Sequence, residues 1–257
     1  MQVVDRGGKV VHSVIMHATD GEKATSVSQI CWDSSGMKLA AIHKGGGTVS
    51  IWHSSTGEVM PIGSGLKDLT FLAWSTTDDV LAIGNQKGGL VLYNDMQKKK
   101  EKFVGKHYKR ICCGFWTADG NLVLGSVDNV ITVSNKHGET LNQINCLGEP
   151  MEIRMHQVEA GKRTVLDVKS MLSINVGRKS ILLADLKKEQ PEPMELKFNE
   201  SYGEIVGHVW TSETNILIGF AAGWAVIISN GRPTCPRSSS ASRSCSTTCR
   251  TCRTAPR

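Results

Sequence analysis

Two groups of residues have the types and spacing that chemistry requires. Cys245, Cys249 and Cys252, with Cys235 upstream, bring thiols close together near the end of the chain and could share a zinc ion. Structural zinc sites usually contain two short ligand pairs separated by a folding segment. This stretch has no second pair, no His and no large apolar residue around the thiols, so we expect no metal site there.

His107 and Asp128 form the second group, because an imidazole and a carboxylate could act as a catalytic dyad. No nucleophile or metal ligand recurs at a fixed offset from them. The chain also lacks a phosphate-binding glycine loop, a nucleophile elbow and a paired His-Glu zinc motif. The sequence therefore predicts a protein that is not an enzyme and carries no cofactor, and we interpret the pair as a structural hydrogen bond.

A basic cluster could also bind something. It comprises Lys98, Lys99, Lys100, Lys102, Lys106, Lys109 and Arg110. Such a cluster could face an acidic partner or an anionic membrane surface. We favour the alternative of a solvated outer strand with its loop, in which lysines discourage edge-to-edge pairing.

The elements that hold these residues follow from a repeat. Trp32, Trp74 and Trp116 stand 42 residues apart, and each ends an apolar run followed by a polar turn and two more short apolar segments. Trp210 stands 94 residues after Trp116, close to two periods, and the interval contains a copy without the tryptophan. A period of roughly 40 to 45 residues with several short strands per unit is typical of a WD-repeat β-propeller.

The predicted fold is therefore all-β: a WD-repeat propeller of the seven-bladed type that is incomplete, with about five to six blades in residues 1–230. About 21 strands can be assigned where seven four-stranded blades need about 28, so we expect a truncated product. The expected blades are residues 1–17 (partial), 28–66, 69–105, 108–147, 150–199 and 203–230 (partial). The structural repeat positions are Trp32, Trp52, Trp74, Tyr93, Trp116, Trp210, His107 and Asp128.

Residues 231–257 differ from the rest in composition. They contain Ser, Thr, Arg, Cys and Pro but no acidic and no large apolar residue, which predicts a disordered tail. Six of the 30 basic residues lie there, so the other 24 balance the 24 acidic ones and the net charge of +6 belongs to the tail. Its arginines could bind RNA or DNA, but it has no aromatic residue for base stacking, and we expect no nucleic-acid partner.

Two further observations concern location. The first residues do not show the charged and then apolar pattern of a signal peptide, so we expect no secretion. The longest apolar run, residues 216–228, is 13 residues long and is interrupted by two glycines. Because a membrane-spanning helix needs about 20 apolar residues, we expect no transmembrane segment.

Three stretches carry a more specific resemblance: residues 105–116, residues 128–135 with Gly138, and residues 81–94. They resemble the N-terminal propeller of WD-repeat subunits of intraflagellar transport complex A. This resemblance implies a non-enzymatic scaffold subunit that acts in retrograde ciliary transport and in the ciliary entry of membrane cargo. The implied partners are the other subunits of that complex, a tubby-like adaptor and the dynein-driven train. The implied locations are the cilium or flagellum, the basal body and the cytoplasm.

Two other classes of function stay open. The same period is found in adaptors of other intracellular complexes, such as vesicle coats or substrate receptors of ubiquitin ligases. An enzyme or a nucleic-acid binder has little support, because the motifs of both classes are missing from the repeat.

Overall fold

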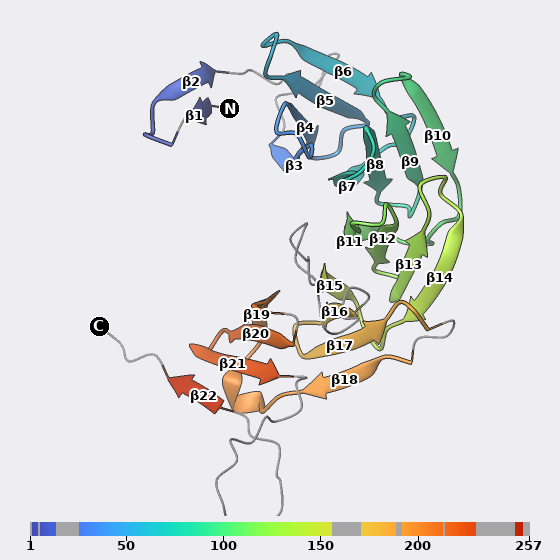
Figure 1. The fold of residues 1–257 in the computed structure, drawn as a ribbon. Helices are drawn as coiled ribbons and strands as arrows, with labels where there is room; N and C mark the ends of the chain where they lie inside the picture. Colours follow the sequence, from blue (N-terminus) through green and yellow to red (C-terminus); the bar gives the residue numbers. More distant parts are fainter. Residues whose placement is uncertain are drawn as a thin grey trace, which may run out of the picture. The chain divides into compact units, whose positions relative to one another are not determined.

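A computed structural model describes residues 2–4, 6–13, 26–155, 171–188, 192–212, 214–229 and 250–253 (Figure 1). These residues form antiparallel β-sheets, and their only helical element is the 3₁₀ turn η2 (Glu200–Tyr202). The prediction of an all-β fold is therefore confirmed. The chain divides into two compact units, Met1–Pro150 and Met151–Arg257.

The first unit contains one two-stranded sheet and three four-stranded sheets. The two-stranded sheet pairs β1 (Gln2–Val4) with β2 (Val10–Ser13). The next sheet consists of β3 (Val27–Trp32), β4 (Lys38–His43), β5 (Thr48–His53) and β6 (Val59–Gly63). The remaining two consist of β7 (Leu69–Trp74), β8 (Val80–Asn85), β9 (Leu90–Asn94) and β10 (Lys99–Phe103), and of β11 (Ile111–Trp116), β12 (Leu122–Ser126), β13 (Val130–Ser134) and β14 (Thr140–Asn145).

The second unit contains two four-stranded sheets. Their strands are β15 (Pro150–Met155), β16 (Met171–Val176), β17 (Ser180–Asp185) and β18 (Met194–Lys197), then β19 (Ile205–Trp210), β20 (Asn215–Phe220), β21 (Trp224–Ser229) and β22 (Arg250–Arg253). In each sheet every strand pairs with the next one along the chain. The turn between second and third strands therefore lies at the same end of the sheet as the connection to the following sheet.

The tail predicted for residues 231–257 is described at four residues only. Arg250–Arg253 form β22, which pairs with β21. The sequence predicted a disordered tail, and the structure differs from that prediction at these four positions. The physical reason is that the outer edge of β21 presents unpaired backbone N–H and C=O groups to which another segment can hydrogen-bond.

The middle strands are buried on both faces, which explains their nearly continuous apolar sequence. In β8, for example, every residue after Val80 is buried. In the first unit one apolar cluster joins the β3–β6 sheet to the β7–β10 sheet, and another joins the β7–β10 sheet to the β11–β14 sheet. Leu81, Ile83, Leu122 and Leu124 are fully buried there, and each contributes roughly 2 kcal/mol through burial.

The first strands of four sheets share a bulge. The pairing of β3, β7, β11 and β19 with the next strand slips by one residue near the start of each strand. In β7 the extra residue is Thr70, whose hydroxyl donates a hydrogen bond to the carbonyl of Ile111 in β11 at 2.8 Å. A bulge bends the strand and redirects its side chain, so here it links two successive sheets.

The turn after β8 is fixed against the connection that precedes β11. The Asn85 side chain accepts hydrogen bonds from the backbone N–H groups of Lys87 and Gly89 at 3.1 and 2.8 Å. Gly88 has φ +79°, and its carbonyl accepts from the N–H of His107 at 3.2 Å. A Cβ on Gly88 would meet the carbonyl oxygens of His107 and Lys109. Only glycine fits this close approach of two backbones.

Candidate interaction site

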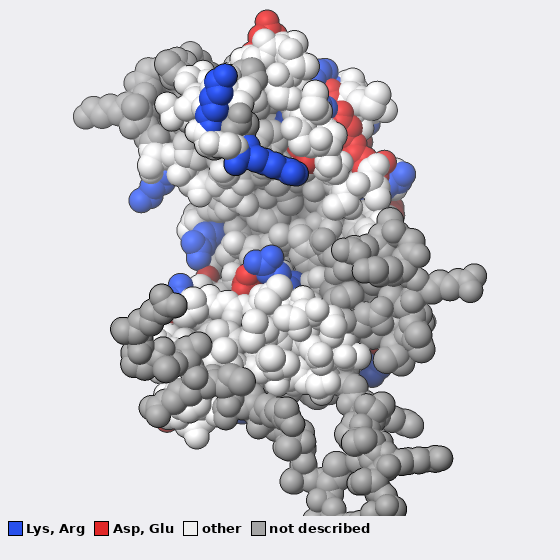
Figure 2. All heavy atoms as spheres, turned by 60° about the vertical axis from the view of Figure 1, so that its left-hand side comes forward, with Lys and Arg blue, Asp and Glu red and all other residues white. Residues whose placement is uncertain are grey.

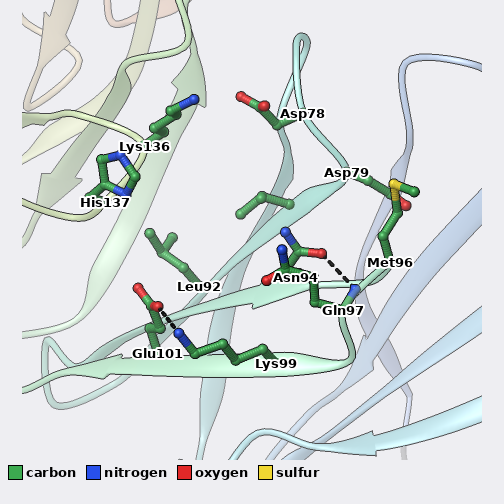
Figure 3. Close-up of a pocket in the computed structure, with 11 residues that line it drawn as sticks. Asp78, Asp79, Leu92, Asn94, Met96, Gln97, Lys99, Glu101, Lys136 and His137 are labelled. Carbon is green, nitrogen blue, oxygen red and sulfur yellow. Dashed lines mark hydrogen bonds and ion pairs between the residues drawn. The ribbon is translucent and has the colours of Figure 1, made fainter.

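A pocket of about 490 Å³ opens where the β7–β10 sheet meets the turn between β13 and β14 (Figure 3). Leu92 and Val80 supply its apolar part, and the exposed Met96 lies at its margin. The other residues are polar or charged and come from strand ends, turns and the middle of β10. They are Asp78, Asp79, Asn94, Gln97, Lys99, Glu101, Lys136 and His137.

The polar groups of the pocket are partly engaged with one another. Lys99 Nζ lies 2.8 Å from Oε1 of Glu101, and the Asn94 side chain accepts from the backbone N–H of Gln97 at 2.9 Å (Figure 3). Lys136 is exposed and forms no ion pair with any residue that the structure describes. A pocket that combines an apolar floor with charges of both signs can bind a segment of another protein.

An ion network behind this pocket joins two sheets. Lys38 at the start of β4 lies 2.7 Å from Asp79 and 2.6 Å from Asp95, which lie in the β7–β10 sheet region. Asp95 is only 4% exposed and also contacts Lys98 Nζ at 2.7 Å, and it accepts a hydrogen bond from the Tyr93 hydroxyl at 3.1 Å. The two ammonium groups hold the pKa of Asp95 down to about 2 against its burial.

Most lysines of the basic cluster make contacts with other residues of the fold. On β10, Lys100 and Lys102 donate to the carbonyls of Gly63 and Gly65 at 2.7 and 3.3 Å. Lys106 donates to Gly138 O and to Thr140 Oγ1, both at 2.7 Å. The structure thus supports the interpretation of an outer strand and its loop for these lysines, and adds that they tie neighbouring segments together.

His107 and Asp128 lie together in the first unit. The His107 Nδ1 is 3.2 Å from Asp128 Oδ2, and its Nε2 is 3.0 Å from the Thr132 hydroxyl. A carboxylate only accepts, so Nδ1 carries the proton and Nε2 accepts from Thr132. The His107 side chain is 1% exposed, which leaves no room for a substrate. Thr132, which completes this group, was not predicted from the sequence.

A similar arrangement in the second unit was not predicted at all. His208 Nε2 lies 2.9 Å from the Ser173 hydroxyl, and its Nδ1 lies 3.2 Å from Glu152 Oε2, close in distance but not aligned as a hydrogen bond. This order of groups resembles an acid–histidine–serine triad. However, Ser173 is fully buried and its oxygen already accepts from Trp210 Nε1 at 2.8 Å, so the group serves to hold β16 against β19.

These two histidines predict a dependence of stability on pH. Burial is the largest influence on both, and it lowers the pKa of His107 and of His208. Below about pH 6.5 the unfolded chain takes up protons first, so the free energy of unfolding falls with falling pH. Urea midpoints at pH 7.5 and 5.5 measure this change. The His107→Gln variant should show a smaller change, and equal changes in both proteins would contradict the assignment.

The predicted repeat positions lie in different parts of the fold and differ in burial. Trp32 is 43% exposed and packs edge-on against the buried Trp52, with ring centroids 6.1 Å apart. Trp74 and Tyr93 share one apolar cluster, and Lys38 Nζ lies 5.7 Å from the Trp74 ring centroid.

Trp116 is buried and donates through Nε1 to the carbonyl of Ala73 at 3.0 Å. Trp210 is half-buried and contacts Ser173. The structure therefore brings together Trp32 with Trp52, Trp74 with Tyr93 and His107 with Asp128, whereas Trp116 and Trp210 contact other residues. It does not join all eight in one site, and their role as repeat positions stays a prediction.

Metal, membrane and charge features can be stated for the described residues. No group of three or more His, Cys, Asp or Glu residues is arranged there to bind a metal ion. Cys235, Cys245 and Cys249 lie outside those residues, and only the backbone of Cys252 is described. Among the same residues, no helix has the length and apolar character needed to cross a membrane. Basic and acidic side chains are scattered on the face in Figure 2, with uncharged surface between them.

The family is decided by comparison with known proteins. The family model described as the WDR19 first beta-propeller matches residues 1–251. This chain belongs to the WDR19 first-propeller family. The prediction of a WD-repeat β-propeller is thereby confirmed, as is the resemblance from which it was identified.

Individual members of the WDR19 family agree with this match. WD repeat-containing protein 19 of Homo sapiens is 36% identical over 199 residues, which cover 77% of this chain and 15% of that protein. The Mus musculus protein of the same name is 34% identical over 203 residues. WD repeat-containing protein dyf-2 of Caenorhabditis elegans is 31% identical over 204 residues, 78% of this chain and 14% of that protein. The chain thus spans about a seventh of the length of these relatives.

Proposed function

We propose that this chain is part of a non-enzymatic scaffold subunit of intraflagellar transport complex A. The observation that carries the proposal is membership in the WDR19 first-propeller family over nearly the whole chain. The relatives are much longer than this chain, so the role of the whole protein enters as a proposal. In this role it works in retrograde ciliary transport and in the ciliary entry of membrane cargo, at the cilium, the basal body and in the cytoplasm.

Its partners would be the other subunits of that complex, with a tubby-like adaptor and the dynein-driven train. The two histidine groups that could resemble catalytic sites are buried, which supports a role in protein contacts. The pocket in Figure 3 is the contact that we assign to such a subunit, because it combines apolar floor, exposed Met96 and charges of both signs. Partly apolar, partly charged hollows are suited to anchoring a side chain of a partner.

Co-purification from ciliated cells tests the proposal. The tagged chain should recover other subunits of complex A, and Met96→Asp should reduce that recovery at least fivefold, because a carboxylate at the pocket margin is costly to bury under a partner. Met194→Asp, an exposed methionine outside the pocket, is the matched control and should leave recovery unchanged.

The outcomes separate the two parts of the proposal. Failure of the unaltered chain to recover any subunit of complex A would overturn membership in that complex. Full recovery with Met96→Asp would instead show that the pocket is not a contact. Recovery of vesicle-coat or ubiquitin-ligase subunits in place of complex A would identify an adaptor of another pathway.

A further inference from the structure

The connection between β10 and β11 holds an aromatic side chain out in solvent on a fixed backbone. Tyr108 is 87% exposed, although its own N–H donates to Asp128 Oδ2 at 2.9 Å. The preceding His107 is buried and its N–H donates to Gly88 O. The following Lys109 offers its carbonyl to the Ser126 hydroxyl at 3.0 Å. An exposed aromatic residue on an ordered backbone loses little conformational entropy when a partner covers it.

Three lysines lie along the same end of the first unit's sheets as Tyr108. Lys67 precedes β7, Lys87 lies in the turn between β8 and β9, and Lys109 precedes β11. The backbones are in contact, because the N–H of Gln86 donates to the carbonyl of Asp68 at 2.9 Å, and Gly88 approaches the carbonyl of Lys109. The row is therefore set by the fold and not by three mobile loops.

The charges of this row are not balanced inside the chain. Lys67, Lys87 and Lys109 are exposed, and none of them forms an ion pair with a described residue. Most neighbouring acidic groups interact with residues outside the row, since Asp128 contacts His107 and Glu149 pairs with Arg110 at 2.9 Å. This leaves three ammonium groups facing solvent beside one exposed aromatic ring, with Asp68 as the nearest exposed carboxylate along the chain.

We propose that Tyr108 and the row Lys67, Lys87 and Lys109 form a docking surface for an acidic segment of a partner protein, with an apolar side chain placed on the Tyr108 ring. Carboxylates of the segment pair with the ammonium groups, and the ring supplies the buried anchor. The surface lies at the end of the sheets opposite to the turns that line the pocket, so it is a separate contact. It rests on the proposed function only in that it requires a protein partner.

A protein segment fits these observations better than a polyanion or a lipid surface. Residues 1–150 contain nearly equal numbers of basic and acidic residues, so no large positive field is available to attract a nucleic acid. Asp68 next to Lys67 would repel a continuous row of phosphates. Membrane binding through basic residues takes larger clusters of about four to eight Lys or Arg. Three lysines with one aromatic ring match a short acidic peptide.

Selection of peptides on the whole chain tests this surface. A phage-displayed pool of random 12-residue peptides is panned against the immobilised chain, and we expect the recovered sequences to carry several Asp or Glu around one aliphatic or aromatic residue. Lys87→Glu/Lys109→Glu and Tyr108→Ala should each weaken the binding of such a synthetic peptide at least tenfold. The charge-matched control Lys179→Glu/Lys197→Glu changes two exposed lysines of the second unit that belong neither to the row nor to the pocket, and it should leave Kd unchanged.

Folding of the variants is checked by urea midpoint, which should not move for these exposed side chains. Recovered peptides without an acidic excess, or binding that survives Lys87→Glu/Lys109→Glu, would overturn the proposal. The same would follow if those substitutions removed binding to a single-stranded oligonucleotide or to phosphatidylserine vesicles while peptide binding persisted. Because peptide binding is measured on this chain alone, its failure is distinct from a failure to co-purify with complex A.

Discussion

Replacing Gly88 with alanine should lower the free energy of unfolding by roughly 3 kcal/mol or more. Two costs add at this residue. Its φ of +79° disfavours any side chain, and a Cβ would collide with the carbonyl oxygen of His107 and lie 2.8 Å from that of Lys109. Both obstacles are backbone atoms of the connection before β11, so relief requires that connection to shift. Urea unfolding followed by tryptophan fluorescence measures the loss.

Gly45 provides the matched control for this substitution. It lies in the turn between β4 and β5, has the same φ of +79°, and a Cβ there would meet nothing within 4 Å. Gly45→Ala should therefore cost only the backbone preference, about 1–2 kcal/mol. Equal losses for the two variants would mean that the close approach at Gly88 contributes nothing to stability.

Replacing Asp95 with alanine should cost about 3 kcal/mol, since it removes the buried central carboxylate of an ion network whose other members are partly or fully exposed. Lys38 would then pair with Asp79 only. The Tyr93 hydroxyl and Lys98 would lose the carboxylate that they contact. The exposed Asp119 is the control, and Asp119→Ala should change the free energy of unfolding by less than about 0.5 kcal/mol. A loss for Asp95→Ala as small as that of the control would contradict the central role of Asp95.

The same network predicts how stability responds to pH. The pKa of Asp95 is about 2 in the fold, so its contribution is present above about pH 4 and is lost as the pH falls toward 2. The pKa of Tyr93 is raised to about 12, first by burial and then by Asp95. The unfolded chain therefore ionises first above pH 10, and this contribution declines between pH 10 and 12. Ion pairing raises the pKa of Lys38 against its burial, so its contribution declines at alkaline pH too.

The difference in urea midpoint between the unaltered chain and Asp95→Ala measures this response. It should be constant from pH 5 to 9 and should shrink at both extremes. A difference that stays constant down to pH 2 would exclude Asp95 as the titrating group.

The repeat and its individual strands could be predicted because short stretches of sequence determine them. The 42-residue spacing of Trp32, Trp74 and Trp116 reflects one supersecondary unit per period. Leu81–Gly84 and Leu90–Tyr93 lie in β8 and β9 as their apolar character indicates. His107 and Asp128 are close in space because a connection and a turn at the same end of adjacent strands must meet.

The candidate sites depend on contacts between residues that the sequence does not relate to one another. Lys38 meets Asp95 across 57 positions, and the hydroxyl of Thr132 meets His107 across 25 positions. His208 and Ser173 come together across 35 positions, between the repeat that lacks its tryptophan and the repeat of Trp210. The pocket and the exposure of Tyr108 depend on how two sheets pack, which no single repeat encodes.

The links between successive sheets have a consequence for synthesis of the chain. Gln29 exchanges hydrogen bonds with Leu72, Thr70 reaches Ile111, and Lys38 reaches Asp79. Each bond spans one repeat, 41 to 43 positions. At roughly 5–20 residues per second on the ribosome, a newly emerged sheet waits roughly 2–8 seconds for its neighbour. During this interval its apolar face is open, which makes every repeat a separate opportunity for a chaperone to bind.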